Sequence, residues 1–413
     1  MRVDDVPIEI ANGPRAHARP SAGFAVDAMH AASPPAPLVA IESWSVTTVL
    51  GRGLLGTYRR LLDGDCIADH TRVADVRAPG RAAALARFVA GQLTCAGFSS
   101  GAAVVVGTSK GSVEDWFDPP PVTSTSDNPH GGLSVSGLGD IAAAVSRACR
   151  TNGPVLTVSA ACASGLHALI RAAMMIRAGE VRQALVVATE ASVHPLFLAN
   201  FQRLGVLAQP GAGCRPFDRN RSGFYMSEAA AAVLLEAAEP DGSLRSRRAG
   251  FRRHRHLQDP VYIDRFALGG DATHLTGGDP GARVLRHLLH KVIDGRPVNL
   301  IHAHGTGTEL NDATELAAIE SAVGDSEGEP PVVYSHKAAL GHSLGASGLV
   351  SVVLNCAAHT TGRVPPNART TDPVPTRRVV IPPTPTERRI ERSLAIAAGF
   401  GGPTAVVSLT SVP

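Results

Sequence analysis

Short apolar runs alternate with alanine-rich helical patterns from Leu38 to the end of the chain. The helical patterns include 162–178 and 282–293. This alternation predicts an α/β fold with mostly parallel sheets. The apolar runs predict ten strands, at 38–48, 102–107, 154–160, 184–190, 229–236, 261–268, 299–304, 331–336, 393–399 and 404–410.

A polar, arginine-rich stretch, 239–256, divides these strands five and five. We therefore expect two halves of similar build, 38–245 and 246–413, although no residue-by-residue repeat is visible. Residues 1–37 lack sustained periodicity, which predicts a mobile leader. Met29 lies within this leader, and a translation start at Met29 rather than Met1 is one hypothesis.

Composition and charge exclude several functions. The 413 residues include 39 Lys and Arg against 36 Asp and Glu, a net charge of +3, so bulk attraction to nucleic acid or to a membrane surface is not expected. No run approaches the roughly 20 apolar residues of a spanning helix, and the first residues do not resemble a signal peptide. Six widely spaced cysteines predict reduced thiols. We expect a cytoplasmic protein.

Cys162 follows a strand and a turn of small residues, and an apolar helix begins near it. A thiol at a helix N-terminus feels the positive end of the macrodipole, which favours the thiolate and so a nucleophile. The backbone N–H of this residue is a candidate donor to an oxyanion. The competing interpretation is a buried apolar cysteine, and the position alone does not decide between the two.

Two histidine-containing turns follow strands of the second half. His302 and His304 end one strand and precede a Gly-Thr turn, while Lys337 and His342 flank a turn of small residues. The His-x-His pair also suggests a metal, but no third ligand cluster is legible and no metal is predicted. Active sites collect at the carboxyl ends of parallel strands, so the cysteine, His304 and His342 are expected to meet.

Six segments in order resemble the motifs of the β-ketoacyl synthases of the thiolase fold, in the branch with a Cys-His-His triad that elongates fatty acids or polyketides. The match covers most of the chain after residue 38. It implies a five-layered αβαβα architecture of two similar halves. The segments are VSAACASG, CRPFDRNRSGFYMSEAAAAVLLE, GGDATHLTGGDP, HAHGTGTELNDATE, SHKAALGHSLGASG and AAGFGGPTAVVSL.

The resemblance implies a decarboxylative Claisen condensation. Cys162 takes an acyl group as a thioester, and His304 and His342 polarise a malonyl thioester and assist its decarboxylation. The carbanion formed then attacks the acyl-enzyme. Two N–H donors suit this chemistry because negative charge develops on an enolate oxygen.

The resemblance also implies supporting roles around the triad. Lys337 holds the histidines through a buried charged network with Glu315. Phe400 gates access, and its backbone N–H completes the oxyanion hole with that of Cys162. Asp312 belongs to the supporting network, and Asp312, Glu228 and His274 fall on family positions that are scaffold rather than chemistry. Thr306, Thr308 and, less surely, Thr276 contact the pantetheine arm, with simple turn chemistry as the equal alternative.

Two departures from the family pattern concern gating and chain-length preference. Ser227-Glu228-Ala229 stands where Gly-Glu-Gly is common. Pro403 follows the GFGG turn, removes a backbone donor and stiffens the loop.

The resemblance implies an acyl carrier protein as partner, a homodimer or a heterodimer with a related subunit, and no resident cofactor, since substrates arrive on phosphopantetheine. One alternative is a thiolase-like or starter-unit enzyme that uses coenzyme A, against which the GHSLGASG context of His342 argues. Another is a catalytically silent chain-length partner, against which Cys162 argues. The basic stretch 246–256 is either a docking surface for an acidic carrier protein or a solvated face.

Overall fold

The computed structural model describes residues 37–76, 80–94, 98–117, 137–239, 242–244, 259–274, 277–325 and 328–412. Residues 36–413 form one compact unit. The expected leader up to residue 36, the basic stretch 246–256 and Thr276 lie outside the described residues. The boundary proposed between 245 and 246 also lies there and stays a prediction.

All ten predicted strands are present, and three further strands of two residues each lie between them. The strands are β1 (Val39–Thr48), β2 (Gly51–Arg52), β3 (Ala103–Gly107), β4 (Val155–Val158), β5 (Gln183–Glu190), β6 (Ala229–Ala237), β7 (Val261–Gly270), β8 (Leu300–His302), β9 (Val332–Tyr334), β10 (Arg363–Val364), β11 (Thr386–Glu387), β12 (Arg392–Ala398) and β13 (Pro403–Thr410).

The helical patterns expected over 162–178 and 282–293 are confirmed as α5 and α8. The helices are α1 (Leu54–Leu62), α2 (Arg81–Leu93), α3 (Glu114–Phe117), α4 (Gly139–Cys149), α5 (Ser164–Arg177), α6 (Pro195–Arg203), α8 (Arg283–Ile293), α9 (Glu309–Val323), α10 (Lys337–Leu340) and α11 (Ser347–Thr361), with a 3-10 turn η1 (Leu344–Ala346) before α11.

The long strands form one sheet in the order β4-β3-β5-β6-β1-β7-β13-β12-β8-β9. Each half contributes its own strands in the same order: third, second, fourth, fifth and first. In each half the outer pairs are parallel and the inner pairs antiparallel. The two halves therefore have the same build.

The expectation of mostly parallel sheets is wrong. The fifth strand of each half, β6 or β13, runs back between the fourth and the first and pairs antiparallel with both. An antiparallel return such as β12 to β13 needs only a short turn and no crossover helix. The alternation of apolar runs with helical patterns carries no signal for such a strand.

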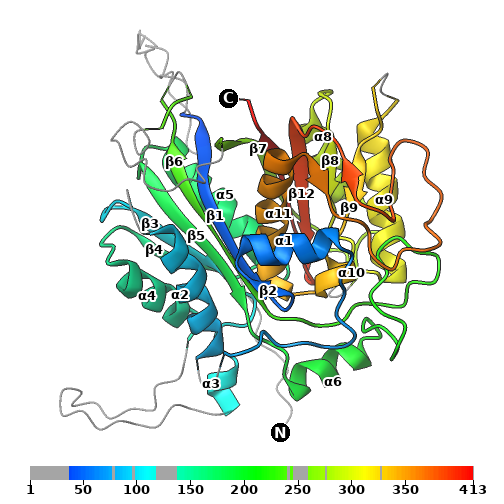
Figure 1. Ribbon diagram of the computed structural model, residues 1–413, viewed down its shortest axis with the longest axis horizontal. Coiled ribbons are helices and arrows are strands. Elements are labelled where there is room, and N and C mark those ends of the chain that lie inside the picture. Colours follow the sequence, from blue (N-terminus) through cyan, green and yellow to red (C-terminus); the bar gives the residue numbers. More distant parts are fainter. Residues whose placement is uncertain are drawn as a thin grey trace, which may run out of the picture. The chain divides into compact units, whose positions relative to one another are not determined.

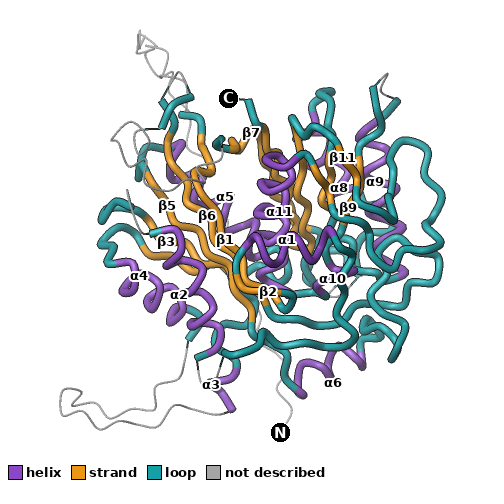
Figure 2. Tube along the Cα trace, in the orientation of Figure 1, coloured by secondary structure: helices purple, strands orange, loops and turns teal. Residues whose placement is uncertain are grey.

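The two halves of the sheet pack on opposite sides of α5 and α11, which contact strands of both halves (Figures 1 and 2). Helices α2 and α4 cover the outer face of the first half, and α8 and α9 that of the second. This arrangement is the five-layered, thiolase-like αβαβα architecture expected from the sequence.

The two central helices meet through glycines. A Cβ atom on Gly165 of α5 would lie 2.9 Å from the backbone nitrogen of Leu349, and one on Gly348 of α11 would lie 2.8 Å from Cγ of Leu166. These close approaches bring the start of α5 against the turn that precedes α11. Cys162 and His342 stand just before these two helix starts.

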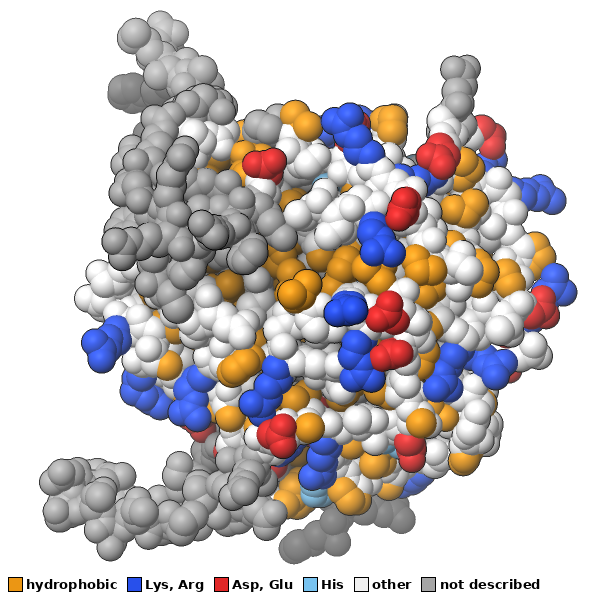
Figure 3. All heavy atoms as spheres, in the orientation of Figure 1, with side chains coloured by type: hydrophobic (Ala, Val, Ile, Leu, Met, Phe, Trp, Pro, Cys, Tyr) orange, Lys and Arg blue, Asp and Glu red, His pale blue; other side chains and the backbone are white. Residues whose placement is uncertain are grey.

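Basic and acidic side chains are interspersed over the described part of the face drawn in Figure 3, which agrees with the small net charge. No helix among the described residues is long and apolar enough to cross a membrane.

Candidate active site

Cys162 lies in a tight turn between β4 and α5, two residues before the first residue of the helix. The preceding Ala161 has a φ of 47°, in the left-handed region that non-glycine residues rarely adopt. The Ser164 hydroxyl accepts the N–H of Ala160 at 2.9 Å and donates to the carbonyl of Ala161 at 2.6 Å. These bonds hold the strained turn and fix the cysteine in place.

The side chain of Cys162 is buried in an apolar cluster between the two halves. Aromatic rings of this cluster come from α6, from the segment before β6, and from the turn after β12. Its other buried members are Val193, Phe201, Leu207, Cys214, Phe224, Met226 and Leu344, and Phe197, Leu198, Val206 and Phe400 pack against it.

Burial raises the pKa of the Cys162 thiol to about 11, and the positive charges of Lys337 and Lys110 offset only part of this effect. Loss of hydration therefore opposes the thiolate that the helix N-terminus favours. A neutral thiol must give up its proton before it attacks, so the site needs a proton acceptor.

His304 and His342 meet beside this cluster, with ring centroids 5.5 Å apart and an interplanar angle of 80°. His342 stacks edge-on against Phe224 at 4.9 Å. Burial and the Lys337 charge hold the pKa of both histidines well below the usual range, so both rings are neutral. Nδ1 of His342 is buried without a hydrogen-bond partner in the described part of the chain. An orphaned buried nitrogen of this kind is typical of a site that awaits a ligand.

Two carboxylates hold the turn that carries His304. Glu315 accepts the backbone N–H groups of His304 and Gly305 at 2.6 and 2.7 Å. Asp312 accepts those of Gly307 and Phe217 at 3.1 and 2.7 Å. Both carboxylates project from α9, so this helix fixes the turn.

Lys337 holds the same turn through a carbonyl group, whereas the two carboxylates bind N–H groups. Its Nζ donates a hydrogen bond to the carbonyl oxygen of His304. The expected Lys337–Glu315 network exists only through the backbone, and no direct ion pair joins these two described side chains. Each charge satisfies a peptide group of the 304–305 segment instead.

The threonines of the turn bond to each other. The hydroxyls of Thr306 and Thr308 are 3.0 Å apart, and that of Thr308 also caps α9 by accepting the N–H of Asn311 at 3.4 Å. These bonds are the turn chemistry considered as the alternative, and a pantetheine contact stays a prediction.

Phe400 lies in the turn between β12 and β13 and packs on the Cys162 cluster. The ring centroids of Phe400 and Phe201 are 6.2 Å apart. Gly399 brings this turn against the cysteine, since a Cβ atom there would lie 3.1 Å from the backbone nitrogen of Cys162. The N–H groups of Phe400 and Cys162 donate to no carbonyl or side-chain oxygen of the described residues. Two donors on adjacent turns, the one at Cys162 next to its own sulfur, suit an oxyanion hole.

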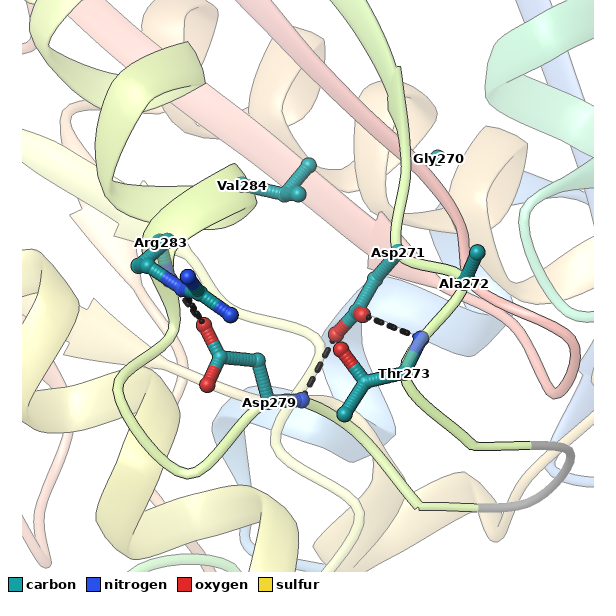
Figure 4. Close-up of a pocket in the computed structure, with 7 residues that line it drawn as sticks. All are labelled: Gly270, Asp271, Ala272, Thr273, Asp279, Arg283 and Val284. Atoms are coloured by element: carbon teal, nitrogen blue, oxygen red, sulfur yellow. Dashed lines mark hydrogen bonds and ion pairs between the residues drawn. The ribbon is translucent and has the colours of Figure 1, made fainter.

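A pocket of about 400 Å³ lies on the outer side of this turn, at the end of β7 (Figure 4). Its wall is joined to the turn that carries Phe400, because the N–H of Asp271 donates to the carbonyl of Gly402 at 3.0 Å. The carboxylate of Asp271 accepts backbone N–H groups of Thr273 and Asp279, and Asp279 pairs with Arg283 at 2.7 Å (Figure 4). These carboxylates thus hold the loop rather than a ligand.

The two departures from the family pattern lie at structural positions. The N–H of Ser227 donates to the carbonyl of His342 at 3.1 Å, so this segment supports the second histidine. Glu228 forms a buried ion pair with Arg81 of α2. Pro403 is the first residue of β13, and its carbonyl accepts the N–H of Gly399 at 2.8 Å.

Sequence reasoning did not single out Glu190, a fully buried carboxylate at the end of β5. It accepts the N–H and hydroxyl of Ser109 at 2.8 and 2.6 Å, the hydroxyl of Ser192 at 2.6 Å and the N–H of Gly345 at 3.2 Å. It therefore ties the loop after β3 to the turn that follows His342. A glutamate at the end of an apolar strand gave no sequence signal for this role.

His274 is exposed and accepts the N–H of Gly277 at 2.9 Å.

The pH dependence of catalysis should follow Glu315 and Lys337. Burial raises the pKa of Glu315 to about 7 and lowers that of Lys337 to about 8. Below pH 7 the carboxylate takes up a proton and loses acceptor strength, and above pH 8 the lysine loses its charge. We expect a bell-shaped profile of kcat/KM with its maximum between these values.

The variant Glu315→Gln should lose the acidic limb of this profile. Glu320→Gln, on the same helix, is the matched control because Glu320 accepts the N–H groups of Arg377 and Arg378 instead. An acidic limb that persists in Glu315→Gln contradicts the assignment.

The raised pKa of Glu315 also affects the free energy of unfolding. Between about pH 4.5 and 7 the native state binds a proton that the unfolded state does not, so the contribution of Glu315 to stability falls as pH rises through this range.

Comparison with known proteins agrees with this geometry. The N-terminal domain of β-ketoacyl synthases matches residues 84–240, and the C-terminal domain of the same enzymes matches residues 269–371. The fold and the Cys-His-His cluster define a thiolase-like protein. The chain belongs to the β-ketoacyl synthase family.

Several relatives are similar over much of the chain. The tetracenomycin polyketide synthase ketoacyl synthase alpha subunit of Streptomyces glaucescens is 32% identical over 260 residues, which are 60% of this chain and 58% of the relative. The 3-oxoacyl-[acyl-carrier-protein] synthase 2 of Mycobacterium bovis is 31% identical over 235 residues, 54% of this chain and 53% of the relative. The chain thus spans less than two thirds of the length of either relative.

Solved structures match more completely. The ishigamide ketosynthase/chain length factor has a TM-score of 0.77 at 26% identity and covers 91% of this chain and 100% of its own. The structure titled AntDE:AntF, an acyl-carrier protein in complex with its ketosynthase, has a TM-score of 0.77 at 21% identity over 91% of this chain and 100% of its own, and shows the fold alone.

Proposed function

We propose that this protein is a β-ketoacyl synthase that joins an enzyme-bound acyl group to a malonyl thioester with loss of carbon dioxide. One observation carries the proposal: two neutral, buried imidazoles lie 5.5 Å apart at the edge of the apolar cluster that holds Cys162. A buried thiol, neutral N–H donors and a water-poor apolar surround are what this condensation requires.

The first half-reaction transfers the acyl group. The Cys162 sulfur attacks the thioester carbonyl, and its proton passes by way of a neutral imidazole to the departing carrier thiolate. The N–H groups of Cys162 and Phe400 receive the oxyanion of the tetrahedral intermediate. The products are the acyl-enzyme and a free carrier thiol.

The second half-reaction breaks the bond between the malonyl carboxylate and its α-carbon. Carbon dioxide leaves, and the electron pair passes to an enolate whose oxygen accepts hydrogen bonds from His304 and His342. The α-carbon then attacks the acyl-enzyme carbonyl, and the Cys162 thiolate departs and regains a proton from solvent. Neutral imidazoles suit this step because each keeps one N–H that donates a hydrogen bond to the enolate oxygen. The proposed reaction needs no resident cofactor and no metal.

A carrier protein and a second subunit are the proposed partners. Strand β4 ends the sheet, no described strand pairs with its outer edge, and Val155 on it is 41% exposed. An unpaired edge with an apolar residue favours pairing with another chain. We propose dimerisation there, as a homodimer or with a related subunit, four residues before the nucleophile. A neighbour titled ketosynthase/chain length factor supports the second form. A cytoplasmic location stays a prediction.

The choice of acyl donor tests this proposal against the coenzyme A alternative. The protein is incubated with the same acyl group on an acyl carrier protein or on coenzyme A, and its intact mass is followed with time. We expect faster acyl uptake from the carrier protein. Uptake only from coenzyme A supports the starter-unit alternative and contradicts a carrier-protein enzyme, and no uptake from either supports the silent chain-length partner.

A further inference from the structure

A second pair of histidines lies behind the reacting residues, where the proposed chemistry does not use it. His302 and His336 are almost completely buried, with Nε2 of His302 2.8 Å from Nδ1 of His336. Nδ1 of His302 is 3.0 Å from Oδ1 of Asn355, and Nε2 of His336 is 3.3 Å from the hydroxyl of Ser347. Four side chains from β8, the start of α10 and α11 thus form one continuous chain of polar contacts.

The direction of every hydrogen bond in this chain follows from one end. Nδ2 of Asn355 donates to the carbonyl of Leu394 at 2.9 Å, so its Oδ1 is the atom that faces His302. His302 must therefore carry its proton on Nδ1 and accept at Nε2. His336 then donates from Nδ1 and accepts the Ser347 hydroxyl at Nε2. The Ser351 hydroxyl, which donates to the carbonyl of Ser347, also lies 3.5 Å from Nδ1 of His336 and can accept from it. Both rings are the Nδ1–H tautomer, and all four ring nitrogens are occupied.

Protonation of His302 would break this chain, because two N–H donors would then face each other across 2.8 Å. Protonation of His336 would instead force the Ser347 hydroxyl to turn from donor to acceptor. Burial lowers the pKa of His302 to about 3 and holds that of His336 well below its usual range. The charge of Lys337 acts in the same direction on both rings, and His304 and His342 also face His336. The occupied ring nitrogens leave none for a metal ion.

This chain of polar contacts joins the segments that carry His304, Lys337 and His342. His302 stands two residues before His304, and His336 precedes Lys337 directly. Ser347 begins α11, five residues after His342. Simple core packing needs no polar chain here, and an apolar core avoids the risk of unpaired buried nitrogens. A continuous network with fixed donors instead sets the separation of the segments.

We propose that His302 and His336 are positioning residues that hold His304 and His342 at the spacing required for decarboxylation. They touch no substrate and transfer no proton. This inference rests on the proposed condensing function. It separates the half-reactions: acyl transfer to Cys162 needs the turn before α5 and one imidazole to pass on a proton, whereas decarboxylation needs both imidazoles in register.

Imidazole nitrogen NMR of the full chain, with labelled histidine, tests the tautomers directly and needs no activity. We expect two Nδ1–H signals that do not titrate between pH 5.5 and 8 and that disappear in His302→Phe and His336→Phe. A titrating signal, or an Nε2–H tautomer, at either position overturns the locked chain.

Half-reaction kinetics test the positioning role. In His336→Leu, decarboxylation of malonyl carrier protein should fall between about tenfold and a hundredfold, as for a small misplacement of reacting groups. Acylation of Cys162 should fall less than about threefold. His336→Asn, which retains a donor toward His302, should recover part of the decarboxylation. Equal losses in both half-reactions, or no recovery in His336→Asn, overturn the positioning role.

His359→Leu is the matched control, because His359 lies on α11, is largely buried and bonds to Ser393 at 2.9 Å outside this chain. It should leave the ratio of the two half-reactions unchanged, and a changed ratio contradicts the specific role of the pair. Failure of the wild type to take up any acyl group refutes the proposed function instead. The NMR result on the tautomers does not depend on activity.

Discussion

Replacement of Cys162 by alanine should abolish acyl transfer, with no acyl adduct after incubation with acyl carrier protein and condensation reduced by at least about 10³-fold. The sulfur is the only protein atom in the proposed mechanism that forms a covalent bond with the acyl group. The burial and the raised pKa of this thiol do not disqualify it, since neutral imidazoles at the edge of its apolar cluster are available to accept the proton. Intact-mass analysis of both proteins measures the effect.

Cys214→Ala is the matched control for this experiment. Cys214 belongs to the same apolar cluster, and burial raises its pKa as well, but its sulfur donates to the carbonyl of Thr306 at 3.7 Å and adjoins no helix start. This variant should still take up the acyl group. An adduct of equal size on Cys162→Ala, or its loss only in Cys214→Ala, contradicts the assignment of the nucleophile.

Replacement of His342 by alanine should separate the half-reactions, with acylation retained and carbon dioxide release from malonyl carrier protein lowered about 10²- to 10³-fold. This is the usual effect of removing one donor to a developing oxyanion. The orphaned Nδ1 of His342 and the contact with the ring of His304 support the role proposed for it on the malonyl thioester. Release of carbon dioxide is measured with carboxyl-labelled malonyl carrier protein.

His274→Ala serves as the control for that measurement, because His274 is exposed and bonds locally to Gly277. Its rates should match the wild type. Carbon dioxide release at the wild-type rate in His342→Ala shows that the enolate is stabilised elsewhere and refutes the role of this histidine.

The strands and the two-half architecture were predictable because buried strands of Val, Ile, Leu and Ala are bounded by turn residues. The direction of the inner strands was not, since β6 and β13 have the same apolar pattern whichever way they run. Strand direction follows from the connections between strands within each half, and local periodicity in a single sequence does not encode these.

At the site, the sequence identified the turn with Cys162 and the two histidine motifs through their order and small-residue context. The sequence did not reveal which groups the buried charges bind, nor how burial acts on the Cys162 thiol. Lys337 was expected to pair with Glu315, yet each charge binds the 304–305 backbone instead. The thiolate expected at Cys162 is opposed by burial. Both outcomes depend on distance and solvent exclusion in the folded chain, which motif spacing does not report.

The central claim, decarboxylative condensation, is tested most directly by the fate of carbon in a single mixture. Wild-type protein is combined with an acyl-loaded carrier protein and malonyl carrier protein that is labelled with ¹³C at all three malonyl carbons. We predict a 3-oxoacyl product that retains two of the labelled carbons, and labelled carbon dioxide in equal amount. A product that retains all three labelled carbons, or acyl-enzyme that persists without any elongated product in the presence of malonyl carrier protein, contradicts the account.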